Sequence, residues 1–133
     1  RRQHVAMHWA ATFGRTEVVK YLLAVGLDPA STDSNRMNLL HNATSAPHVE
    51  LVRYLLSLNA IPLEGRNAWD GTVLSSMLYF ATEARHRHRE RIPAFVECLE
   101  LLIAAGANPD AIDYIVGIPV IDSVLDRHRP RPQ

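Results

Sequence analysis

The stretch Glu17-Val-Val-Lys-Tyr-Leu-Leu23 occurs three times along the chain in variant form. Residues 50–56 read Glu-Leu-Val-Arg-Tyr-Leu-Leu, and residues 97–103 read Glu-Cys-Leu-Glu-Leu-Leu-Ile. A turn that ends in proline follows each copy, at Gly26-Leu-Asp-Pro29, Asn59-Ala-Ile-Pro62 and Gly106-Ala-Asn-Pro109. The first two copies are 33 residues apart, and the third follows the second after 47 residues, one period plus 14. A unit of this length that recurs along a chain is typical of a repeat architecture.

A second motif lies nine residues before the first two glutamates. It reads Val5-Ala-Met-His8-Trp-Ala-Ala11 in unit one and Asn38-Leu-Leu-His41-Asn-Ala43 in unit two. The corresponding stretches are Thr72-Val-Leu-Ser75 in unit three and Ile118-Pro-Val-Ile121 in unit four. These motifs resemble the T-P-L-H-x-A signature of ankyrin repeats, whose period is about 33 residues. The resemblance implies an all-α solenoid of stacked helix–turn–helix units with projecting hairpin-like loops.

The repeats predict one ankyrin-repeat domain over residues 1–133. Its units are expected at about 1–32, 33–66 and 67–112, with a partial unit at 113–133. The first residues carry no initiator Met and no apolar leader. We therefore expect the chain to be a piece of a longer protein.

The third unit is the enlarged one. Glu97 follows Ser75 by 22 residues, whereas the same separation is 9 in the first two units. The additional residues, near 81–93, contain good helix formers followed by Pro93, so the first helix is predicted to run on and Pro93 to open the second. Arginines and histidines alternate along 85–91 without an apolar face. We expect this insertion to lie in solvent or over a partner, outside the core.

Composition limits the function classes. The formal net charge is zero, which argues against long-range attraction of nucleic acid. The single cysteine, Cys98, lies in an apolar slot of the repeated helix, so we expect a buried structural thiol and an intracellular compartment, cytoplasmic or nuclear. No apolar run approaches the roughly 20 residues that span a bilayer. Neither catalytic motifs nor metal-ligand spacings occur, so no enzyme activity, cofactor or metal is expected, and the oligomeric state is left open.

Four repeated positions are predicted to be structural. His8 and His41 occupy one slot 33 residues apart. The resemblance implies a packing residue there, whose imidazole hydrogen-bonds the neighbouring backbone. Gly26 and Gly106 end the second helices, because glycine adopts the left-handed backbone at low cost.

The family binds protein through its loop tips and the exposed side of its first helices, which together line a concave groove. The slots that correspond to this groove predict partner-binding residues. They are Phe13, Asn35, Met37, Arg66, Trp69, Tyr79, Tyr114 and Ile115. The apolar members are expected to be exposed, and Trp69 and Tyr114 are the predicted anchors, because tryptophan and tyrosine are enriched at binding hot spots.

Two alternatives to groove binding stay open. Arg85, Arg87 and Arg89 in the insertion offer bidentate contacts to acidic groups, phosphate or nucleic acid, although nucleic acid is disfavoured by the small size of the patch. The chain also suits a targeting domain of a larger enzyme.

Overall fold

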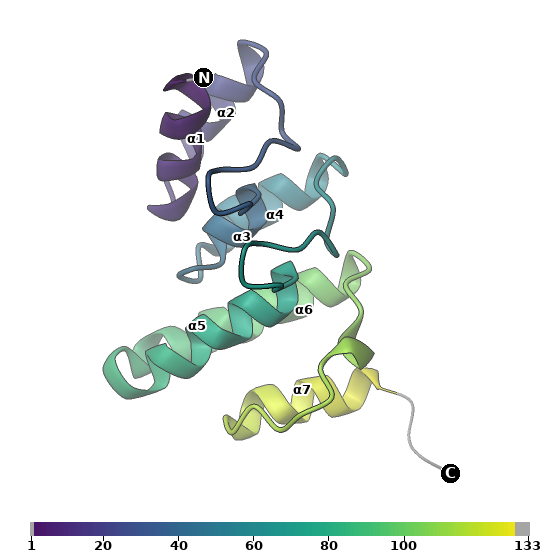
Figure 1. Ribbon diagram of the computed structural model, residues 1–133. Coiled ribbons are helices and arrows are strands. Elements are labelled where there is room, and N and C mark those ends of the chain that lie inside the picture. Colours follow the sequence, from purple (N-terminus) through teal and green to yellow (C-terminus); the bar gives the residue numbers. More distant parts are fainter. Residues whose placement is uncertain (1, 130–133) are drawn as a thin grey trace.

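The computed structural model describes residues 2–129, and in that range it contains helices and turns but no strand. The helices form three stacked pairs and one further helix (Figure 1). The pairs are α1 (Arg2–Thr12) with α2 (Thr16–Ala24), α3 (Leu39–Ala43) with α4 (Val49–Ser57), and α5 (Val73–Arg87) with α6 (Ile92–Ala104); α7 (Pro119–His128) completes the stack. The predicted all-α solenoid is confirmed.

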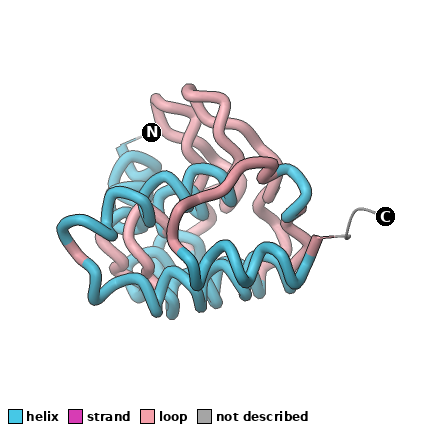
Figure 2. The backbone as a smooth tube through the Cα atoms, turned by 90° about the horizontal axis from the view of Figure 1, so that it is seen from below, coloured by secondary structure: helices cyan, strands magenta, loops and turns pink. Residues whose placement is uncertain are grey.

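The helices form two layers because the units repeat the same geometry. The first helices α1, α3 and α5 pack against one another, and α4 packs against α6 in the second layer. The connecting segments between units gather on one side of the stack (Figure 2). One apolar core runs between the layers, with Leu39, Leu55 and Leu99 among its completely buried side chains. The second helices α2, α4 and α6 contain the repeated stretches that begin at Glu17, Glu50 and Glu97.

The second helices end where the sequence predicts. Gly26 and Gly106 have φ angles of 106° and 111°, and Asn59 takes the same place in unit two with φ 50°. Glycine has no Cβ to clash in this region, and asparagine is among the residues that tolerate it best.

The insertion in unit three is helical, and it is partly in the core. Helix α5 continues to Arg87, a short 3₁₀ turn η1 (Arg89–Arg91) follows, and Pro93 lies in the first turn of α6. The insertion was expected to lie wholly outside the core, and this was wrong for one face of the extended α5. Ala81 and Ala84 are buried in the same core cluster as Phe95 of α6. Both helices of the unit are lengthened, so each covers the other's extension.

Exposed polar contacts join helices of neighbouring units. Lys20 of α2 lies 5.0 Å from the ring centre of Tyr54 on α4. Arg53 of α4 pairs with Glu97 of α6 at 3.0 Å. Glu100 of α6 pairs with Arg127 of α7 at 3.2 Å. These exposed contacts each bridge one boundary between units.

Candidate functional site: the groove between loops and first helices

Two loops between units are built alike. In the first, the Asp33 carboxylate accepts hydrogen bonds from the main-chain N–H groups of Asn35 and Met37, at 2.8 and 3.0 Å. In the second, the Asn67 carboxamide oxygen accepts from Trp69 and Gly71, at 3.0 and 2.9 Å. Asx side chains stabilise turns in this way. Each turn closes through a residue of positive φ, Arg36 at 56° and Asp70 at 61°.

The two loops are also linked to each other. The N–H of Ala68 donates to the carbonyl of Asn35 at 2.8 Å, and the Arg36 guanidinium reaches the carbonyl of Asn67 at 3.4 Å. The loop tips therefore stand side by side and form one wall of a groove. Side chains of α1 and α5 form the other wall, and the buried Asn42 of α3 lies at its base. We use "the groove" for this surface.

The groove contains two hollows. The second hollow, of about 580 Å³, lies between the loop at 67–71 and α5. Trp69, with 70% of its surface exposed, and Tyr79 line it beside Phe80, whose ring meets that of Tyr79 edge-on at 5.5 Å. Met37 and Ser76 also line this hollow and are themselves buried. The Tyr79 hydroxyl donates to Glu83 at 3.1 Å, and this bond raises the pKa of Tyr79.

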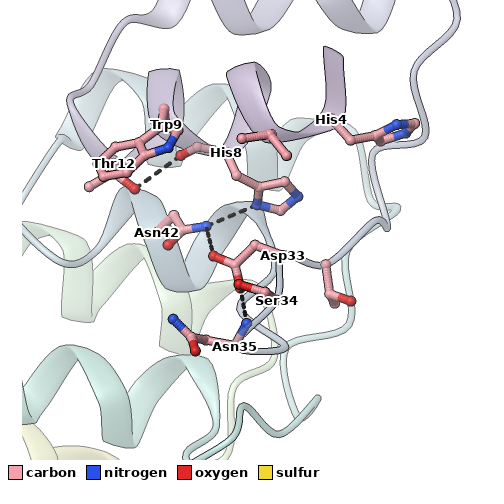
Figure 3. Close-up of a pocket in the computed structure, with 10 residues that line it drawn as sticks. His4, His8, Trp9, Thr12, Asp33, Ser34, Asn35 and Asn42 are labelled. Carbon is pink, nitrogen blue, oxygen red and sulfur yellow. Dashed lines mark hydrogen bonds between the residues drawn. The ribbon is translucent and has the colours of Figure 1, made fainter. Parts of the chain in front are cut away.

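The first hollow, also about 580 Å³, lies between α1 and the loop at 32–35 (Figure 3). Trp9 stands on its α1 wall and stacks on Phe13, with ring centres 5.6 Å apart and planes within 12°. Below it the Asn42 amide nitrogen donates to His8 Nδ1 at 2.9 Å and to the Asp33 carboxylate at 3.3 Å (Figure 3). The wall is therefore aromatic and the floor is polar.

His8 and His41 are both buried and hydrogen-bonded; His41 bonds the backbone, as the resemblance implies, whereas the partners of His8 are the side chains of Ser31 and Asn42. His41 Nδ1 accepts from the N–H of Asn38 at 3.1 Å, so Nε2 carries the proton and donates to the carbonyl of Gly71 at 2.9 Å. His8 Nδ1 accepts from Asn42, so its Nε2 donates to the Ser31 hydroxyl at 3.1 Å. Burial lowers the pKa of both imidazoles, which the Asp33 charge only partly offsets.

In unit three, Ser75 replaces the histidine and keeps its capping interaction at the start of the first helix. Ser75 Oγ accepts from the N–H of Thr72 at 2.9 Å, and the Thr72 hydroxyl accepts from the N–H of Ser75, as Asn38 does for His41. Both pairs are capping boxes at the start of a first helix. A serine is too short for the additional bond to the next loop. Serine can therefore occupy the histidine position in unit three, because the capping interaction is retained.

Most of the predicted groove residues are exposed. Phe13, Asn35, Trp69, Tyr79, Tyr114 and Ile115 all lie at the surface, Ile115 with 84% exposure. The prediction that Met37 is exposed was wrong, since only 8% of it is accessible. Met37 is drawn inward because its N–H is bound by Asp33, and the Asn67 amide donates to its sulfur at 3.2 Å.

The third loop and the arginines lie apart from the two hollows. Tyr114 and Ile115 line a smaller depression with Asp113, Asp122 and Arg129. Arg66 is exposed, but it donates to the carbonyl of Asp70 at 2.9 Å and pairs with that carboxylate at 3.6 Å. The structure thus brings Trp69 and Tyr79 together in the second hollow, whereas Tyr114 lines a separate depression.

Arg85 was expected to be free for a partner and is instead half-buried. Its guanidinium donates to the carbonyl of Gly117 at 2.9 Å, which ties α5 to the loop before α7. Gly117 has φ 90°, and a Cβ there would approach the guanidinium to 2.8 Å. Arg87 and Arg89 point outward and are exposed. The available basic surface is therefore smaller than the sequence indicates.

Trp9 and Asn42 are functional candidates that sequence reasoning missed. Trp9 lies directly after His8, at the variable position of the repeated motif, and four residues before Phe13. That spacing places two aromatic side chains on one helix face. The sequence therefore contained a signal for this aromatic pair, in the spacing of Trp9 and Phe13. The exposure of Trp9 at 59% shows that the face is not buried.

Residues 2–129 hold no cluster of three metal-ligating side chains. Cys98 is completely buried, and burial raises the pKa of its thiol to about 12. Across the described chain no helix has both the length and the apolar character to cross a membrane.

A family model of ankyrin repeats matches three copies over residues 7–113. The chain belongs to the ankyrin-repeat family. Ankyrin repeats are general protein-interaction modules and are not catalytic.

Three curated relatives show how the repeats are used elsewhere. The chain is 44% identical over 50 residues to the palmitoyltransferase AKR1 of Lachancea kluyveri, covering 38% of this chain and 7% of that protein. It is 40% identical over 68 residues to an L-asparaginase of Dirofilaria immitis, covering 51% and 11%. It is 34% identical over 50 residues to an ankyrin and armadillo repeat-containing protein of Mus musculus, covering 38% and 3%. The match spans at most 11% of these relatives, within the repeats.

Proposed function

We propose that this chain is a non-enzymatic interaction module that binds a partner protein or an extended peptide in the groove. One observation carries the proposal: exposed aromatic side chains from α1, α5 and the second loop surround two hollows on the same side of the stack. A single exposed aromatic residue is ordinary, but a group of them at a concave surface marks a binding site.

The groove is preorganised for binding. Its loops are fixed by the Asx bonds of Asp33 and Asn67 and by the link between Ala68 and Asn35. A partner therefore meets a rigid surface, and little conformational entropy is lost when it binds. Trp69 is the anchor we assign to the second hollow, with Tyr79 beside it; Phe13 stands with Trp9 at the first hollow, and Asn35 supplies polar contacts.

A second candidate is recognition of an acidic or phosphate-bearing partner by the insertion. His86, Arg87, His88, Arg89 and Arg91 are all exposed and lie close together along the chain. Clustered arginines bind carboxylates and phosphates bidentately. Arg87 and Arg89 are the residues that would carry this contact, since Arg85 is held by Gly117. Nucleic acid is a less favoured partner for so small a patch.

The parent protein is proposed to be intracellular and to use this segment for targeting. A single buried cysteine suits a reducing compartment. Two of the relatives bear the names of enzymes, a palmitoyltransferase and an asparaginase, and match only over their repeats. An enzyme joined to this module is therefore one form that the whole protein can take.

Affinity capture from a cell lysate tests the proposal and separates the two candidates. The intact domain, Trp69→Ala and an Arg87→Ala/Arg89→Ala double variant are used side by side at low and high salt. A partner retained at both salt concentrations and lost only with Trp69→Ala supports the groove. A partner lost with salt and with the arginine variant supports the insertion, because contacts with phosphate or carboxylate are screened. Capture that is the same for all three proteins contradicts both sites.

A further inference from the structure

We propose that the groove recognises basic side chains, and that its partner is an extended polypeptide segment carrying arginine or lysine at two positions, one for each hollow. This inference rests on the proposed function, because it names the chemistry of what the groove holds. It is carried by the charges, the free acceptors and the aromatic walls of the two hollows.

Within residues 2–129, each hollow is lined by one carboxylate and by no arginine or lysine, in a chain of zero net charge. Among the described residues that line the first hollow, Asp33 is the carboxylate, and arginine and lysine are absent. The second hollow contains Asp70 and likewise no arginine or lysine. Outside the groove, Arg85 and Arg89 line one depression without a carboxylate among its described residues. The depression at Tyr114 combines Asp113, Asp122 and Asp126 with Arg129. Complementarity of charge therefore favours a cationic occupant for the groove.

The second hollow places carboxylates beside its aromatic wall. Asp70 lines the hollow at the turn next to Trp69, and Glu83, outside the lining, accepts the hydrogen bond of the Tyr79 hydroxyl on α5. Arg66 pairs with Asp70 at 3.6 Å, but the two side chains are 59% and 84% exposed. An exposed ion pair of this kind is weak and is readily exchanged. A guanidinium or ammonium group of the partner can replace Arg66 and gain the aromatic contact in addition.

The first hollow offers acceptors that the fold leaves unused. Asn42 is only 6% exposed, and its amide nitrogen is directed at His8 and Asp33 (Figure 3). Two acceptors fix that nitrogen, so the carboxamide oxygen is turned away from them, and it has no hydrogen bond within residues 2–129. The Asp33 oxygen that Asn42 contacts has further capacity as well, because a carboxylate oxygen accepts about two hydrogen bonds. A ligand with several N–H donors satisfies both groups.

The aromatic walls suit the same ligand. A cation lies favourably over the face of tryptophan or tyrosine, and arginine does so most often. Trp69 lines the second hollow and Trp9, which stacks on Phe13, lines the first, and both tryptophan side chains are exposed. A donor-rich planar cation can therefore stack on the wall and reach a carboxylate with its N–H groups.

The geometry of the stack sets the spacing of the two basic residues. Neighbouring packed helices are about 8–10 Å apart. The two hollows lie on α1 and α5, with α3 between, so two helix spacings separate them, on the order of 16–20 Å. An extended chain spans roughly 3.3 Å per residue, so the two basic side chains are expected about five to six residues apart.

Selection from a random library of displayed 12-residue peptides provides the test. The intact domain is the target, and peptides that also bind Trp69→Ala are discarded. We expect the retained peptides to be enriched in arginine or lysine at two positions. A synthetic peptide from the selection is then compared with versions in which each basic residue is replaced by norleucine, and we expect each replacement to weaken binding by 10-fold or more.

Asp70→Asn identifies the partner of the basic side chain. Asparagine tolerates the positive φ at residue 70, so the turn and the main-chain bond from Arg66 are kept while the charge is removed. We expect a loss of about 5-fold or more in affinity for the parent peptide and little change for the matching norleucine version. Glu17→Gln, on the exposed face of α2, is the matched control and should bind as the intact domain does.

The outcomes separate this inference from the proposed function. Peptides that require Trp69 but tolerate norleucine overturn the basic-side-chain inference and leave groove binding in place. The same follows if Asp70→Asn binds as Glu17→Gln does, or if the selected peptides are acidic. A selection with no Trp69-dependent peptide contradicts both proposals. Melting curves for each variant exclude unfolding as the cause.

Discussion

The imidazole of His41 joins two units, because its Nε2 donates to the carbonyl of Gly71 at 2.9 Å while its Nδ1 accepts from Asn38. Replacing His41 with alanine leaves both backbone groups without their partner in a buried region. Unsatisfied buried groups cost about 1–3 kcal/mol each, so we expect His41→Ala to lower the free energy of unfolding by about 2–4 kcal/mol in urea denaturation.

His41→Ser is the matched control for this prediction. The serine restores the capping box, as Ser75 does in unit three, but it leaves the Gly71 carbonyl unpaired. We expect the free energy of unfolding of His41→Ser to lie between that of wild type and that of His41→Ala. An alanine variant within about 0.5 kcal/mol of wild type would falsify the role of His41, since surface substitutions have effects of that size.

Stability is expected to decrease as the pH falls from 7 to 5. Burial lowers the pKa of His8 and His41 below the ordinary value of 6.5, so the unfolded chain binds protons at a pH where the folded chain does not. Their contribution is complete above pH 6.5 and is lost as the pH falls toward the folded-state pKa values. Melting temperatures across pH 5–8 measure this effect. His41→Gln removes one of the groups and should flatten the curve; an unchanged slope would mean that other groups dominate.

Substitution of Trp69 should affect partner binding, whereas substitution of Met37 should affect folding stability. Trp69 is 70% exposed, whereas Met37 is 8% exposed, although both line the second hollow. We expect Trp69→Ala to weaken partner binding by more than about 1 kcal/mol with an unchanged melting temperature. Met37→Ala should cost about 2 kcal/mol of folding stability, the lower range for a buried methionine. If the tryptophan variant also melts early, Trp69 belongs to the core and the groove assignment fails.

Cys98 should be unreactive in the folded protein. The thiol is completely buried with a pKa of about 12, so almost no thiolate exists at pH 8. A thiol reagent that absorbs on reaction is expected to label the native domain orders of magnitude more slowly than the urea-unfolded domain. Comparable rates for the two states would show that the site opens freely.

The periodic features were predictable from the sequence because each has a local cause. The repeated apolar spacing places α2, α4 and α6, and the helix ends at Gly26 and Gly106 follow from backbone preference. The capping boxes at Asn38 and Thr72 are also local. The lengthened α5 followed from helix formers bounded by Pro93.

Features that depend on tertiary contact were not predictable. Arg36 adopts a positive φ that its residue type does not favour, and the resulting turn sends Met37 inward. The alternating charges of the insertion conceal that Arg85 meets Gly117, 32 residues later in the chain. The groove assignments for Phe13, Asn35, Trp69, Tyr79, Tyr114 and Ile115 have the right exposure, and their role in binding stays a prediction.

The exposed ion pairs between neighbouring units have a mechanical consequence. Arg53–Glu97 and Glu100–Arg127 lie at the surface, where each contact contributes at most about 1 kcal/mol and is screened by salt. The groove side is joined instead by the buried bond from His41 to Gly71. Salt weakens the exposed pairs but not the buried bond, so a change in ionic strength acts on one face of the stack more than on the other. We therefore expect the curvature of the stack, and with it the width of the surface offered to a partner, to respond to ionic strength.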